Sequence, residues 1–323
     1  MSFVRTVLAD IEPTQLGVCY AHEHIIIDRS FTTYLFPDFL LDSVESACTE
    51  LSAFKQAGGN AMIDSMPCGG GRNVLKLAEI SRRTGVYIVC PTGLHLAKYY
   101  PPGHWGERLS SSELAELFIA DIIEGIDSND YSGPTLRRTT HRAGLIKVAG
   151  GLDKLSPYEC KVFEAAAAAH RATGAPILTH TEQGTAALAQ IELLASHGVD
   201  LSHVVLSHTD RKADVSYHKE ILSTGVNVEF DSAFRWPVGE SNPTENLVAA
   251  LFLEGYTSQI LLGMDAARRS YWRSYGGSPG LTFLLEVFRG RLLERGMTQT
   301  DLHRIFVQNP AKAYAFTRTI GRM

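Results

Sequence analysis

Short apolar runs of strand length alternate with longer amphipathic segments along almost the whole chain. The apolar runs predict β-strands at residues 18–27, 60–66, 86–90, 143–149, 176–180, 203–208, 226–231 and 259–265. The longer segments have apolar residues at helical spacing. They predict helices at residues 42–57, 73–84, 112–127, 158–173, 185–196, 217–223 and 243–253, with further helices towards the C-terminus. Strands that are apolar on both faces and alternate with helices are typical of parallel β/α architecture.

Eight units of this kind favour a closed (β/α)8 TIM barrel over an open sheet. The chain has 323 residues and no linker or break in composition, so we expect one domain over residues 1–323. Residues 1–16 precede the first predicted strand and contain one apolar stretch, from Phe3 to Leu8. We expect an N-terminal hairpin or plug there.

Composition argues against several classes of partner. The net charge is −5, and no tract of Lys and Arg is interleaved with aromatic residues, so we expect no nucleic-acid partner. The apolar runs are too short for a membrane span, and the N-terminus lacks the charged-then-apolar layout of a signal peptide. The five cysteines are scattered without a C-x-x-C pair, which predicts reduced thiols in a cytoplasmic protein.

Polar residues recur where the predicted strands end. His22 and His24 lie two positions apart in the first strand, so both imidazoles point to the same face and form half of a metal shell. In a TIM barrel the active site lies at the carboxyl ends of the strands. The other polar residues at such ends are Lys147, His180, His208 and Asp265. This set predicts a metal centre at the C-terminal face of the barrel.

Lys147 is the unusual member of the set, because an ammonium group is a cation with no acceptor. One interpretation is a buried lysine paired with a carboxylate. The other is that burial and nearby charge deprotonate the amine, which then reacts with carbon dioxide. The resulting carbamate is an anion with two oxygens and bridges two metals about 3.5–4 Å apart.

The ordered motifs resemble the phosphotriesterase-related branch of the amidohydrolase superfamily, which includes the phosphotriesterase-like lactonases. They are His22-x-His24, Lys147 in Leu-Ile-Lys-Val, His180 in Leu-Thr-His-Thr, His208 in Leu-Ser-His-Thr-Asp and Asp265 in Gly-Met-Asp, and the match extends to Asn309-Pro310-Ala311. The resemblance implies two divalent metals. His22, His24 and Asp265 would bind the more buried metal, and His180 and His208 the more exposed one. Carboxylated Lys147 and a hydroxide would bridge them. Zinc is the expected metal, though nitrogen and oxygen ligands also accept manganese, cobalt or iron.

This ligand set predicts a hydrolase. Two metals lower the pKa of a bridging water, and the exposed metal polarises a carbonyl or phosphoryl oxygen. Asp265 is placed to take the proton of the attacking hydroxide and pass it to the leaving group. The ligands do not choose among a lactone ester, an amide and a phosphotriester.

The loops after the last two strands bear on the substrate. In TIM barrels these loops often make a phosphate site, and arginine suits phosphate through its bidentate donor fork. We expect an anion clamp from Arg235, Arg268 and Tyr271, with Arg269 and Arg273 as weaker candidates. The alternative is that these arginines make surface or subunit ion pairs. A clamp would favour an anionic substrate over a neutral organophosphate. Because the resemblance implies lactone hydrolysis, we expect a sugar lactone that carries a phosphate.

The segment after the third strand departs from the family pattern. Relatives often carry Tyr or Trp near the metals, whereas here His95 follows Thr-Gly-Leu. His95 would hydrogen-bond a polar substrate or act as a second acid, or it is a loop residue with no role. Tyr99 and Tyr100 are candidates for the pocket wall.

Three functions remain open from the sequence. The first is a metal-dependent lactonase with a small-molecule substrate. The second is a hydrolase of the same centre acting on an N-acyl amino or sulfonic acid, or a promiscuous phosphotriesterase. The third is a non-enzymatic metal-binding barrel, which the complete ligand set argues against. Related proteins are often dimers, so the resemblance also implies a homodimer.

Overall fold

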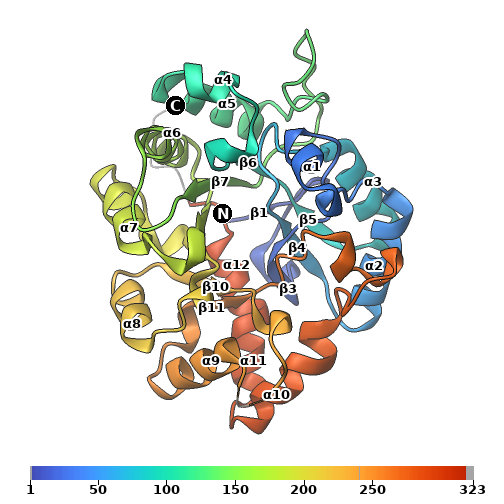
Figure 1. Cartoon of the computed structure of the whole chain (residues 1–323), viewed down its shortest axis with the longest axis vertical. Helices are drawn as coiled ribbons and strands as arrows, with labels where there is room; N and C mark the ends of the chain where they lie inside the picture. The colour runs from blue at the N-terminus through green and yellow to red at the C-terminus, as the bar shows by residue number, and fades with distance from the viewer. Residues whose placement is uncertain (1, 240, 318–323) are drawn as a thin grey trace.

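The computed structural model describes residues 2–239 and 241–317, and its centre is a ring of parallel strands with helices outside it (Figure 1). One sheet has the order β3 (Cys19–Glu23), β4 (Ala61–Asp64), β5 (Tyr87–Val89). The other runs through β6 (Pro91–Gly93), β7 (Leu145–Gly150), β8 (Ile177–Thr181), β9 (Val204–Ser207), β10 (Asn227–Phe230) and β11 (Ile260–Leu262). Only Cys90 separates β5 from β6, so together they fill one position of the ring.

The ring closes between its first and last strands, β3 and β11. The amide nitrogens of Met264 and Asp265 lie 3.3 and 3.1 Å from the carbonyl oxygen of His22 and donate to it. The carboxylate of Glu23 accepts from the amide of Met264 at 2.8 Å. The expected (β/α)8 barrel is therefore confirmed, and its closure brings the loop after β11 against β3.

The helices cover the outside of the ring (Figure 1). The helices that correspond to predicted segments are α2 (Val44–Gln56), α3 (Val74–Thr84), α5 (Ser111–Ile123), α6 (Pro157–Thr173), α7 (Ala187–Ser196), α8 (Val215–Ser223) and α9 (Pro243–Leu253). Shorter helices are α1 (Phe31–Leu35), α4 (Trp105–Arg108), α10 (Arg289–Glu294), α11 (Gln299–His303) and α12 (Asn309–Ala313). No helix in the described part of the chain is long and apolar enough to cross a membrane.

Capping residues explain where the main helices begin and end. The Ser110 and Ser156 side chains cap α5 and α6 in capping boxes, and Gly85 and Gly174 end α3 and α6 in the left-handed conformation. The helix predicted over 112–127 ends earlier, at Ile123. Two residues further on, Gly125 has a φ of 139°, which a helix does not accommodate.

The first predicted strand, 18–27, is also too long. Strand β3 ends at Glu23, and its pairing with β4 shifts in register between Tyr20 and Glu23. Beyond the strand, the amide of Ile25 donates to the side chain of Asp64 at 2.9 Å instead of to a neighbouring backbone carbonyl. Apolar content alone did not reveal this end, because the residues after β3 are buried as well.

Two apolar clusters stabilise the barrel, one between strands and helices and one inside the ring. The inner cluster contains Leu145, Leu178, Val205 and Leu261 from four strands of the ring, all essentially inaccessible to solvent. Val4 joins this cluster from the antiparallel pair β1 (Val4–Arg5) and β2 (Asp10–Ile11). Each such side chain stabilises the fold by about 1.5–3 kcal/mol, so the interior below the site is a packed core.

Candidate metal centre and active site

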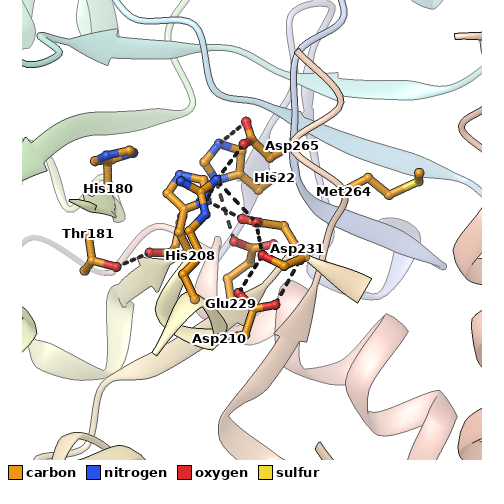
Figure 2. A network of polar contacts seen from close by, with 12 residues as sticks. His22, His180, Thr181, His208, Asp210, Glu229, Asp231, Met264 and Asp265 are labelled. Carbon is orange, nitrogen blue, oxygen red and sulfur yellow. Dashed lines mark hydrogen bonds and ion pairs between the residues drawn. The ribbon is translucent and has the colours of Figure 1, made fainter. Parts of the chain in front are cut away.

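The six residues predicted as metal ligands come together at the carboxyl ends of the strands. His22, Lys147 and His180 lie within β3, β7 and β8; His24 follows β3, His208 follows β9 and Asp265 follows β11. All six line one pocket, which has a volume of about 210 Å³. Figure 2 shows His22, His180, His208 and Asp265 converging there from different strands.

The imidazoles form a row across the pocket floor. The ring centroids of His24 and His22 are 5.6 Å apart, those of His22 and His208 4.6 Å, and those of His208 and His180 4.6 Å. Burial lowers the pKa of His22 and His208 well below the usual value, and the positive charges of Lys147 and Arg211 add to this effect. Neutral imidazole is the form that binds metals, so His22 and His208 are in the right protonation state.

Asp265 completes one metal-sized cluster. Its Oδ1 lies 3.3 Å from His24 Nε2 and 3.8 Å from His22 Nε2. Burial alone would raise the pKa of Asp265. The hydrogen bond from His24 and the nearby charges of His208 and Arg235 instead hold it well below its usual range. Ligand atoms of His22, His24 and Asp265 all lie within 4.8 Å of one another, which is close enough to share one ion.

In His22 and His208, the Nδ1 nitrogen contacts a residue beneath the pocket floor. Ser207 Oγ lies 2.8 Å from His22 Nδ1, and the Asp231 carboxylate contacts His208 Nδ1 (Figure 2). Such contacts fix the ring and leave Nε2 for a metal. His180 differs, because its Nε2 is 3.0 Å from Glu182 Oε2. In His180 the nitrogen left for a metal is therefore Nδ1.

Lys147 is buried without a partner. It is 1% exposed, and in the described part of the chain its Nζ makes no hydrogen bond or ion pair. The pairing with a carboxylate that would explain a buried lysine is therefore not seen among these residues. Burial lowers the pKa of Lys147 to about 8. Gly93 lies opposite Lys147 in β6, where an added Cβ would stand 1.9 Å from the Lys147 carbonyl oxygen.

The residues predicted to contact substrate line the same pocket. Arg235 Nη1 lies 3.4 Å from the Tyr271 hydroxyl, and Arg235 Nη2 lies 2.9 Å from Asp265 Oδ2. The guanidinium of Arg268 stands over the Phe39 ring at the pocket wall, 3.9 Å from Asp38. These positions bring three of the predicted binding residues to one cavity.

His95 and Tyr99 form another part of the pocket wall. The His95 ring lies 4.5 Å from the Tyr99 ring and 5.0 Å from the His180 ring, centroid to centroid. Burial and the charge of His180 lower the pKa of His95 well below its usual value. Its Nδ1 accepts from the Leu96 amide at 2.8 Å, so in the neutral ring Nε2 carries the proton and is a donor.

Other candidates face elsewhere. Tyr100 is buried, and its hydroxyl donates to the Cys68 carbonyl at 3.0 Å, so it supports the loop and does not line the pocket. Arg269 pairs with Asp42 at 3.1 Å and Arg273 with Glu286 at 3.6 Å. For these two arginines the surface ion-pair interpretation fits.

Sequence reasoning missed three polar residues of the site, namely Arg211, Glu229 and Asp231. Glu229 is a buried acidic residue within β10 and Asp231 is one directly after it, the same signal that identified Lys147. In the described part of the chain the Glu229 carboxylate has no hydrogen bond, and it lies 3.6 Å from His22 Nδ1. Arg211 stands three positions after His208 and lines the pocket.

Comparison with known proteins agrees with this geometry. The model of the phosphotriesterase family matches residues 2–314. A phospho-furanose lactonase of Mycoplasmopsis synoviae (strain 53) is 32% identical over 324 residues, which cover 97% of this chain and 92% of the relative.

Two solved structures share the fold and much of the sequence. The crystal structure of a lactonase from Listeria monocytogenes superposes with a TM-score of 0.90 at 31% identity, covering 98% of this chain and 100% of that one. The phosphotriesterase homology protein from Escherichia coli, complexed with phosphate in its active site, superposes with a TM-score of 0.83 at 31% identity, covering 93% and 99%. The resemblance inferred from the motifs is confirmed: the chain belongs to the phosphotriesterase family, whose members are metal-dependent hydrolases.

Proposed function

We propose that the protein is a metal-dependent lactonase that opens a sugar lactone carrying an anionic group, most simply a phosphate. The observation that carries the proposal is that Arg235, Arg268 and Tyr271 line the same pocket as the metal-binding cluster. The phospho-furanose lactonase relative supports the choice of a lactone and of a phosphate. A cationic wall argues against a neutral organophosphate as the substrate.

The residues present fit a binuclear metal site. We assign His22, His24 and Asp265 to the more buried ion and His180 and His208 to the more exposed one. The partnerless amine of Lys147, with its lowered pKa, suits reaction with carbon dioxide. Carboxylation would join Lys147 Nζ to the carbon of carbon dioxide with the loss of one proton, and the anionic carbamate would help to hold both ions. Zinc is the proposed metal, and manganese, cobalt and iron accept the same donors.

When bound, two such ions lower the pKa of an attacking water and polarise the scissile carbonyl. Side chains of the protein transfer the proton and bind the substrate. Asp265 accepts the proton of that water and delivers it to the ring oxygen as the carbon–oxygen bond of the lactone breaks. It is ionised for this role, since its pKa lies well below the usual range. Arg268 and Tyr271 hold the anionic end of the substrate and orient the ring.

The test is a proton-release assay on protein loaded with zinc or manganese in the presence of bicarbonate. It compares pentono-1,4-lactones with and without a 5-phosphate in wild type, Arg268→Met and Arg273→Met. Arg273 is the matched control, because it lies on the same loop and pairs with Glu286 away from the pocket. We expect kcat/KM to favour the phosphorylated lactone, and Arg268→Met alone to reduce that preference about 10- to 100-fold.

Other results would redirect the proposal. Equal rates on the two lactones would assign the arginines a structural role and the substrate to neutral lactones. Hydrolysis of an N-acyl amino or sulfonic acid, with both lactones untouched, would make the protein an amide hydrolase with the same centre. If the metal-loaded protein is inert on every substrate, the non-enzymatic metal-binding barrel is the remaining interpretation.

A further inference from the structure

Arg211 reaches the metal centre because the chain reverses direction at His208. His208 has a φ of 64°, in the left-handed region, and the single 3-10 turn Thr209–Arg211 follows it directly. The Arg211 side chain is thereby returned over the pocket, with 23% of its surface exposed. A side chain that lines the cavity and is still partly open to solvent is available to a ligand.

The polar contacts of the Arg211 side chain leave much of its guanidinium unused. In the described residues they all run through Nη2, which lies 3.0 Å from Asp265 Oδ2, 3.3 Å from His208 Nδ1 and 3.8 Å from Asp231 Oδ1. Nε and Nη1 are free to donate. The Cδ carbon lies between Nε and Nη1, so the two nitrogens cannot bind one carboxylate together, but either can donate a charge-assisted hydrogen bond to a carboxylate oxygen.

Asp265 divides the pocket into a metal side and an arginine side. Its Oδ1 faces His24 and His22, whereas its Oδ2 accepts from Arg211 at 3.0 Å and from Arg235 at 2.9 Å. Two guanidinium groups therefore share one carboxylate oxygen. Both guanidinium groups therefore lie beside the groups that would act on the scissile carbonyl, where a positive charge can meet an anionic ligand.

We propose that Arg211 binds the carboxylate that ring opening creates. The pocket then has an inner anion subsite at Arg211, with Arg235 beside it, and an outer one at Arg268 and Tyr271. This inference rests on the proposed lactonase function. The ligand class is a hydroxycarboxylate with a second anionic group at its far end.

The chemistry of ring opening explains why an inner cation is needed. The oxygen of water bonds to the carbonyl carbon, the bond from that carbon to the ring oxygen breaks, and the ring oxygen leaves as a hydroxyl with one proton. The other proton passes to solvent, so the product has one more negative charge than the lactone. Arg211 therefore meets a neutral carbonyl in the substrate and an anion in the product. It should govern product affinity far more than KM.

The experiment measures binding of ribonate to the zinc-loaded protein by calorimetry, with neutral ribonamide as the matched ligand. Neither compound carries a phosphate, so the outer subsite is not engaged. We expect Arg211→Met to weaken ribonate binding about 10- to 100-fold, the range for a hydrogen bond to a charged group, and to change ribonamide binding by less than about 3-fold. Arg268→Met should leave ribonate binding unchanged. Ribonate should inhibit lactone hydrolysis correspondingly less in Arg211→Met, with KM for the lactone within about 3-fold of wild type.

Two results would overturn the inference. Ribonate binding that is unchanged in Arg211→Met would leave Arg211 as a partner of Asp265 only. An equal loss for ribonate and ribonamide would show that Arg211 positions the site and does not bind the charge. Arg211→Lys keeps the charge beside Asp265 if the methionine variant fails to fold, and the loss of the free guanidinium donors should still weaken ribonate binding several-fold. If wild type opens no lactone, the proposed function fails, while the difference between ribonate and ribonamide still tests the subsite.

Discussion

Replacing Lys147 by methionine should shift the stability of the metal-free and metal-loaded proteins in opposite directions. In the metal-free protein, burial of an ammonium without a partner lowers the pKa from 10.5 to about 8. A shift of this size corresponds to about 3 kcal/mol of unfavourable free energy when the charged amine is buried. Methionine fills a similar volume without charge, so the free energy of unfolding at pH 7 should rise by up to about 3 kcal/mol, or about 5 °C in Tm.

The pH dependence fixes the sign of this effect. Because the folded-state pKa of Lys147 lies below the unfolded value, the unfolded chain binds more protons between about pH 8 and 10.5. The stability of the metal-free wild type should therefore rise across that window, and the penalty is fully present below it. Lys147→Met removes the titrating group, so its advantage over wild type should shrink as the pH rises through the window.

In the metal-loaded protein the same substitution removes the proposed bridging ligand. Wild type should gain Tm on addition of zinc with bicarbonate, since a ligand that binds only the folded state stabilises it. The variant should lose most of that gain and its turnover. Lys161→Met is the control. Lys161 is on α6 and donates to backbone carbonyls, including that of Leu109 at 2.7 Å, so its loss should lower the stability of the metal-free protein.

The assay is urea and thermal unfolding of the three proteins, with chelator and with zinc plus bicarbonate. If Lys147→Met is less stable than wild type in chelator, the Lys147 amine does not destabilise the metal-free protein as a buried group without a partner should. A variant that keeps the full stabilisation by zinc would refute the role of Lys147 as a shared ligand.

Three further substitutions test the supports of the site. Asp231→Asn removes the carboxylate that holds His208, and zinc affinity, measured by chelator competition, should fall about 10- to 100-fold; an unchanged affinity would contradict this role. Arg72→Met leaves Asp121 buried without its 2.9 Å ion pair, so the free energy of unfolding measured in urea should fall by about 3–5 kcal/mol. A fall of under about 1 kcal/mol would show that the ion pair is dispensable. Gly93→Ala forces a side chain into a φ of 105° against the backbone of Lys147, and little folded protein should be seen by circular dichroism; a native melt would show that the backbone yields there.

The barrel and the convergence of six polar residues were predictable because both depend on a local signal. A charged or imidazole side chain near the end of an apolar strand is expected at the carboxyl end of a parallel sheet, and His180 lies near the end of β8, whereas Lys147 lies in the middle of β7. The same signal marks Glu229 and Asp231, and it was not applied to them. The end of β3 was missed because the chain remains buried beyond it.

Arg211 and the sorting of the loop arginines could not be read from the sequence. The role of Arg211 depends on the left-handed conformation of His208, which no residue pattern in this sequence predicts. Arg268 and Arg273 have the same side chain on one loop, and only their partners in space distinguish the pocket residue from the surface ion pair. Tertiary contacts, rather than spacing, decide such assignments.

The most direct test of the central claim is hydrolysis of a phosphorylated pentono-1,4-lactone by the wild-type protein, followed by NMR before and after metal removal. We expect the lactone to open to the hydroxy acid, chelation to abolish the reaction, and zinc with bicarbonate to restore it. A rate that is unaffected by chelation, or a lactone that remains closed under every metal condition, would contradict it.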